Sequence, residues 1–143
     1  MKIWLLDTVT ISELRKNRNR QNPNVANWRE TISLQSCRLS VISILEIQTG
    51  MLKVREKDPE FANRLKVWLE SSILNQFCHR LLDVDTKVVQ EAATFRAEHP
   101  MGVADALIAA TASVYDLTLV TRNISDFQDT GIELLNPREV EDT

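Results

Sequence analysis

Cysteine and histidine are both scarce in this sequence, which limits the metal and redox chemistry open to it. Cys37 and Cys78 stand singly in apolar surroundings with no CxxC pattern, so we expect two buried, reduced thiols rather than a disulfide or a zinc site. His79 and His99 lack the spacing of a metal-binding pair, so each is expected to have a surface or core role. The sequence therefore indicates a reducing compartment and disfavours zinc.

Long hydrophobic runs are also missing. The first apolar run, IWLL, is far shorter than a signal-peptide core, and no stretch approaches the roughly 20 apolar residues of a membrane span. We therefore expect a cytoplasmic protein with no membrane segment. A net charge of -3 does not suggest nonspecific coating of nucleic acid, although a local basic patch could still hold a strand.

The sequence does contain alternating strand and helix patterns, in a number that fits one domain. The 143 residues, 43% of them hydrophobic, carry no repeat, low-complexity segment or linker, which predicts a single domain over residues 1–143. The pattern predicts short strands that alternate with helices, at residues 3–6, 39–41, 80–84, 117–121 and 132–135. Such alternation is typical of a parallel sheet between helices, with sites at the carboxyl ends of the strands.

Four carboxylates stand at the ends of apolar elements: Asp7, Glu46, Asp105 and Asp126. Glu46 and Asp105 have no cation three or four residues away with which to pair along a helix. If the four converge they repel one another, and a hard divalent cation with oxygen ligands is the simplest compensation. Ligands without nitrogen or sulfur indicate Mg²⁺ or Mn²⁺, which can activate water for attack on a phosphodiester.

A structural interpretation remains open for some of these residues. Asp7 is also suited to cap a helix that starts at Thr8, and Asp126 is placed to pair with Arg122. Three polar residues near the acids are candidates to orient them or a metal-bound water: Thr8, Thr121 and Asn123. A basic loop after the first motif is either a solvated surface or a contact for nucleic-acid phosphates: Arg15, Lys16, Arg18 and Arg20.

Read together, the segments LLDT, SVISILEIQTG, GVADALIAATA and LVTRNISDF resemble the four acidic motifs of the PIN-domain nucleases. Their order and spacing are similar to those of VapC-like toxins of type II toxin-antitoxin systems. The segments SELRK and TGIELLNP most resemble the FitB-like branch. The resemblance covers nearly the whole chain.

The resemblance implies an α/β fold, a PIN-like three-layer sandwich with a central parallel β-sheet flanked by α-helices. It further implies a Mg²⁺- or Mn²⁺-dependent endoribonuclease in which Asp7, Glu46, Asp105 and Asp126 bind the metal, with Thr121 and Asn123 in support. The implied partners are RNA, a second copy of the chain, a VapB- or FitA-like antitoxin, and operator DNA only through that antitoxin. One departure is Val9, where such chains commonly carry Asn after the Asp-Thr pair.

Two other functions fit the same residues. A catalytically weak PIN domain could serve as the scaffold of a DNA-binding repressor complex, in which the partner supplies the base contacts. A DNA flap nuclease is disfavoured because the chain is short and lacks extra helices to clamp a duplex.

Overall fold

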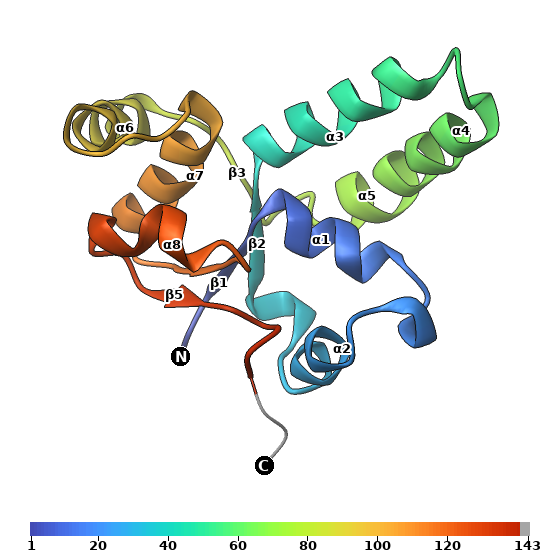
Figure 1. The fold of residues 1–143 in the computed structure, drawn as a ribbon, viewed down its shortest axis with the longest axis horizontal. Helices are drawn as coiled ribbons and strands as arrows, with labels where there is room; N and C mark the ends of the chain where they lie inside the picture. Colours follow the sequence, from blue (N-terminus) through green and yellow to red (C-terminus); the bar gives the residue numbers. More distant parts are fainter. Residues whose placement is uncertain (141–143) are drawn as a thin grey trace.

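Five parallel strands form the centre of the molecule in the computed structural model, which describes residues 1–140 (Figure 1). The strands are β1 Trp4–Leu6, β2 Cys37–Ser40, β3 Leu81–Leu82, β4 Thr118–Val120 and β5 Leu134–Leu135. Their order across the sheet is β3-β2-β1-β4-β5, so β1 lies in the middle. Leu6 of β1 is in register with Val120 of β4, which brings the carboxyl ends of these two strands side by side.

Helices connect the strands and cover the sheet. They are α1 Thr8–Arg15, α2 Pro23–Glu30, α3 Val41–Val54, α4 Pro59–Trp68, α5 Leu74–Gln76, α6 Thr86–Glu98, α7 Val103–Val114 and α8 Ile124–Phe127. A π-helical segment, Leu69–Ile73, joins α4 to α5, and short 3-10 turns occupy Arg18–Arg20, Leu34–Ser36 and Gln128–Thr130. The helices α6 and α7 lie on one side of the sheet, and α1, α2, α4 and α5 lie on the other (Figure 1).

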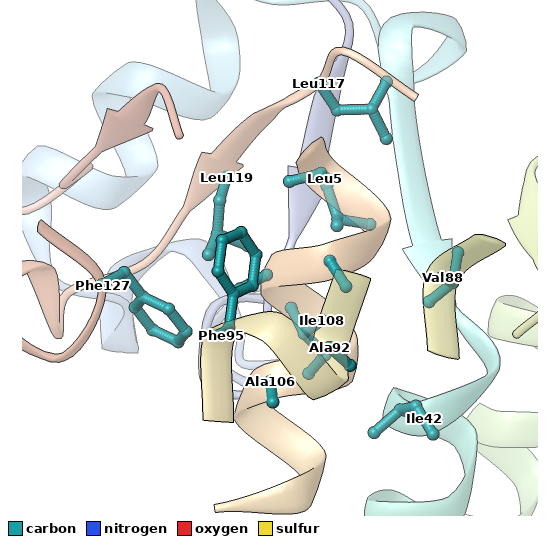
Figure 2. Close-up of a cluster of buried hydrophobic side chains, with 13 residues drawn as sticks. Leu5, Ile42, Val88, Ala92, Phe95, Ala106, Ile108, Leu117, Leu119 and Phe127 are labelled. Atoms are coloured by element: carbon teal, nitrogen blue, oxygen red, sulfur yellow. The ribbon is translucent and has the colours of Figure 1, made fainter. Parts of the chain in front are cut away.

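Two hydrophobic cores, one on each face, hold the three layers together. Successive residues of a strand point to opposite faces, and Leu5 and Leu6 of β1 accordingly belong to different cores. In the first core, Leu5 and the neighbouring Leu119 meet side chains of α6 and α7 such as Phe95 and Ile108 (Figure 2). Because both faces are covered, β1, β3 and β5 are wholly apolar, as is typical of buried parallel sheets, whereas β2 also carries Arg38 and Ser40.

The structure confirms the predicted α/β sandwich and corrects two details. Cys37 is buried, and burial raises the pKa of its thiol, but Cys78 is exposed, so the expectation of two buried thiols is wrong for Cys78. The second strand was expected over residues 39–41 but spans Cys37–Ser40, because Ser40 caps α3 and the helix begins at Val41: the Ser40 hydroxyl accepts from the Ile42 N–H at 3.0 Å. Within residues 1–140, no helix combines the length and apolar character needed to cross a bilayer.

Candidate active site

Asp7 is fixed where β1 ends and α1 begins. Its carboxylate accepts a hydrogen bond from the Thr10 N–H at 2.8 Å, and its own N–H donates to the Val120 carbonyl of β4 at 3.1 Å. The residue is 7% exposed. Asp7 therefore does cap α1, as the structural interpretation predicted, and the helix N-terminus favours its negative charge. The cap leaves the second carboxylate oxygen without a hydrogen bond from the described residues.

Glu46 lies one turn into α3 and is tied to α1 through a hydroxyl. The Thr8 Oγ1 is 2.6 Å from Glu46 Oε1, to which it donates, and 2.8 Å from Ser43 Oγ. Ser43 is fully buried, three residues before Glu46 on the same face of the helix. Asp7 thus supplies one carboxylate of the site, and the adjacent Thr8 supplies the hydroxyl that orients a second carboxylate, that of Glu46.

Asp105 and Asp126 complete the set from the other side of β1. Asp105 is exposed in the first turn of α7, and Asp126 is exposed in α8, where its N–H donates to the Asn123 carbonyl at 3.1 Å. Although the residue as a whole is exposed, partial desolvation of its carboxyl by the surrounding protein raises the pKa of Asp105, and the charges of Glu46, Asp126 and Asp7 raise it further. The charges of the other three acids are close enough to repel the Asp105 carboxylate, so the four acids lie near one another at one end of the sheet.

Among residues 1–140, no lysine or arginine neutralises this acid cluster, by which we mean Asp7, Glu46, Asp105 and Asp126. None of the four forms an ion pair with lysine or arginine in the described part of the chain, so Asp126 does not pair with Arg122. Within residues 1–140, no three acid, histidine or cysteine side chains already converge as ligands of one metal ion. An ion could be held after the exposed side chains of Glu46, Asp105 and Asp126 rotate, and their oxygen-only chemistry fits Mg²⁺ or Mn²⁺.

Thr121 and Asn123 shape the turn that follows β4. Thr121 is fully buried, and its Oγ1 accepts a hydrogen bond from the Asn123 N–H at 3.1 Å. This contact fixes the turn that leads to Asp126, whose N–H donates to the Asn123 carbonyl, and the Asn123 side chain is exposed. The threonine thus acts on the backbone and is too buried to serve as a ligand.

The basic loop lies away from the acid cluster. It follows the C-terminal end of α1, about 12 Å from Asp7 by the rise of that helix. Three of its four cations already have partners: Arg15 packs over the Phe61 and Trp68 rings, Lys16 pairs with Glu13, and Arg18 pairs with Glu30. The structure therefore does not bring this loop to the acids.

Sequence reasoning missed Ser43 as part of the site. Its hydroxyl meets Thr8, which is 35 residues earlier in the chain, and no local pattern predicts that contact. The available signal was a serine on an otherwise apolar face of α3, one turn before an unpaired glutamate. A buried hydroxyl there needs a partner, and the partner turned out to belong to the candidate site.

Comparison with known proteins agrees with this geometry. The sequence model of the PIN domain matches residues 4–133, and the chain belongs to that family. It is 33% identical over 138 residues to Toxin FitB of Neisseria gonorrhoeae, covering 93% of this chain and 96% of FitB. It is 30% identical over 142 residues to the VapC ribonuclease Y4jK of Sinorhizobium fredii, covering 94% and 97%.

Solved structures place the chain in the same branch. FitAB bound to an IR36 DNA fragment has a TM-score of 0.86 and 30% identity, covering 98% of this chain and 99% of that chain. Within the PIN domain family, this protein is thus similar over nearly its whole length to the VapC- and FitB-type toxins.

Proposed function

We propose that this protein is the endoribonuclease toxin of a type II toxin-antitoxin pair and hydrolyses RNA phosphodiester bonds. Asp7, Glu46, Asp105 and Asp126 would hold Mg²⁺ or Mn²⁺ for this reaction. The observation that carries the proposal is the placement of Asp7 at the end of β1, joined through the Thr8 hydroxyl to Glu46, while none of the four acids pairs with a lysine or arginine among the described residues. Membership of the PIN domain family and similarity to a VapC ribonuclease support it.

The residues around the acids have distinct roles in this proposal. When bound, the metal supplies an activated water and neutralises charge on the scissile phosphate. Asp7 keeps one oxygen on the Thr10 N–H and presents the other to the site. The Thr8 hydroxyl orients Glu46, and Thr121 with Asn123 sets the turn that carries Asp126.

The partners follow from the same proposal. The protein would be held inactive by a VapB- or FitA-like antitoxin, would contact operator DNA only through that antitoxin, and would form a homodimer in the cytoplasm. The full chain, residues 1–143, would act as a single domain. The likeness to FitB and to FitAB on DNA supports this set of partners. The basic loop Arg15–Arg20 would contact RNA only beyond the cleavage site, given its distance from the acids.

Cleavage by the isolated chain tests the function. Purified protein free of partner should cut RNA with Mn²⁺, and excess chelator or Asp7→Asn should stop the cleavage. Asparagine keeps an oxygen for the Thr10 N–H while removing the charge, so a lost fold would not explain a lost activity. Cleavage that persists in the variant or in chelator would contradict the metal site.

A catalytically weak scaffold of a DNA-binding repressor complex is the second candidate. Val9 favours it, because this position departs from the Asp-Thr-Asn pattern of the family that the sequence resembles. The side chain of Val9 is 40% exposed and adds apolar surface beside the acids. RNA cleavage separates the two functions. A scaffold would leave RNA intact with Mn²⁺ and would still assemble with its antitoxin on DNA. In that case, Val9→Asn should restore cleavage.

A further inference from the structure

Two arginines lie beside the acid cluster that the proposed chemistry does not yet use. Arg122 and Arg138 line a small cleft of about 10 Å³ together with Val9 of α1 and Pro137, so the cleft brings the two residues together at the surface and is itself too small to enclose a phosphate. Arg122 is two residues beyond Val120, whose carbonyl accepts the N–H of Asp7 at 3.1 Å. The cleft therefore adjoins the acids on the β4 side of the sheet.

Hydrogen bonds from Asn136 and Asn24 hold the backbones of both arginines in place. The Asn136 side-chain amide donates to the Arg122 carbonyl at 3.4 Å, and its oxygen accepts from the Arg138 N–H at 3.0 Å. The Asn24 amide donates to the Arg138 carbonyl at 2.5 Å. One side chain thus bridges the segment after β4 to the segment after β5, and another ties the second segment to α2.

The guanidinium groups themselves have no partner within residues 1–140. Neither forms an ion pair or a side-chain hydrogen bond there. The nearest acid in the cleft, Glu13, is already bound by the Lys16 ammonium and the Asn22 N–H, each at 2.7 Å. These contacts lower the pKa of Glu13, and Arg138 adds only a smaller effect at longer range.

We infer that Arg122 and Arg138 form a phosphate-binding pair that holds the backbone of a single RNA strand next to the acid cluster. The inference rests on the proposed function, because it names how the substrate reaches that site. Guanidinium groups match phosphate oxygens in geometry and charge. Acids beside free arginines suit a phosphodiester backbone, whose successive phosphates can meet a cation held by carboxylates and then a guanidinium.

An acidic peptide is the competing occupant of the same pair. Such a segment would bring carboxylates next to four acids that no lysine or arginine of the described residues pairs with. Its own charges offer nothing to those acids, since a carboxylate-rich peptide gains only at the arginines. The combination of both charges at one edge therefore favours a phosphodiester backbone.

Binding without cleavage tests the pair. A fluorescein-labelled oligouridine of about 12 nucleotides would be titrated with the full chain in chelator, and anisotropy would give Kd at several salt concentrations. We expect Arg122→Gln with Arg138→Gln to raise Kd about tenfold or more and to lower the salt slope by about 1.4, since each single-strand phosphate contact contributes about 0.7. Replacement of both by lysine should keep most of the affinity and the slope.

Lys87 provides the charge-matched control for the single variant Arg122→Gln, which is measured beside the double variant. It is exposed and lies beside Tyr115 at the C-terminal end of α7, about 15 Å along that helix from Asp105. Lys87→Gln removes one positive charge from the molecule without touching the cleft, so it should leave Kd within about twofold. Melting temperatures would be compared for all variants, and Arg122→Gln alone decides the question if Arg138→Gln unfolds the chain.

Three outcomes would overturn the inference. The first is an unchanged Kd and salt slope in the glutamine variant, and the second is an equal loss in Lys87→Gln, which would mean that only bulk charge matters. The third is a pair that binds an oligoglutamate peptide while RNA binding does not depend on it. Because no cleavage is scored, an inactive protein that still binds RNA through both arginines would contradict the proposed function and leave the inference standing.

Discussion

Asp105 bears a cost of gathering four acids at one edge of the sheet. Its pKa is raised by burial and by the charges of Glu46, Asp126 and Asp7. Replacement of Asp105 by asparagine should therefore leave the metal-free fold at least as stable, with an equal or higher melting temperature in chelator at pH 7. A structural aspartate would lose stability on the same change, so a clear drop in melting temperature would contradict this account.

The pH dependence of that difference follows from the sign of the shift. An acid whose folded pKa exceeds its ordinary value of about 4 binds more protons when folded than when unfolded, so stability falls as pH rises through that interval. Asp105→Asn lacks this fall. We expect the two proteins to have similar urea midpoints near pH 3, where the carboxyl is protonated in both states, and the variant to gain relative to wild type above pH 4. A difference in urea midpoint between the two proteins that stays constant from acid to neutral pH would contradict the raised pKa of Asp105.

Thr8 supports a second prediction at the residue scale. Its hydroxyl contacts both Glu46 and Ser43, so Thr8→Val keeps the shape and removes the orienting donor. Loss of such a supporting contact typically lowers metal affinity or activity about 10- to 100-fold, and we expect that loss in RNA cleavage with a higher Mn²⁺ requirement. Thr8→Ser retains the hydroxyl and should cleave nearly as well as wild type. Equal activity in the valine variant would show that Glu46 needs no such support.

Helix α1 depends on the same residue that the active site uses. Asp7→Ala removes the acceptor for the Thr10 N–H and should cost about 1 kcal/mol of stability, whereas Asp7→Asn keeps an acceptor and should cost less. Both should abolish cleavage, because neither offers a negative oxygen to a metal. Urea denaturation beside an RNA assay separates the two roles. If both variants lost the same stability, the cap would depend on charge alone.

The elements themselves were predictable because their physical causes are local. Apolar runs placed all five strands and caps marked the starts of helices, as with Asp58 before Pro59 at α4. Lengths were less predictable: β5 was expected over residues 132–135 but spans only Leu134–Leu135, which pair with Leu119 and Val120 of β4. The exposure of Cys78 also escaped prediction, because it depends on how the turn after α5 faces the solvent.

At the scale of the whole molecule, the sheet determines which charges become neighbours. The acids could be anticipated because each follows a strand or opens a helix at the same edge of a parallel sheet. The Arg122–Arg138 pair could not, because it depends on a side-chain bridge through Asn136. The sequence instead pointed to the basic loop, whose cations the fold directs mostly to Glu13, Glu30 and two aromatic rings.

Metal binding should be visible in the stability of the whole protein, because the acid cluster repels itself only while it is empty of cations. A ligand at 100 times its Kd stabilises the folded state by about 2.7 kcal/mol, so saturating Mn²⁺ should raise the melting temperature by several degrees. Asp105→Asn should start at or above the wild-type value in chelator and then gain little from Mn²⁺. Lys87→Gln, whose site is remote, should gain as much as wild type. An equal rise in melting temperature in all three proteins would assign the effect to nonspecific ion binding. If Asp105→Asn instead melts at or above wild type in chelator and below wild type in Mn²⁺, the repulsion and the ion must act at the same carboxylates.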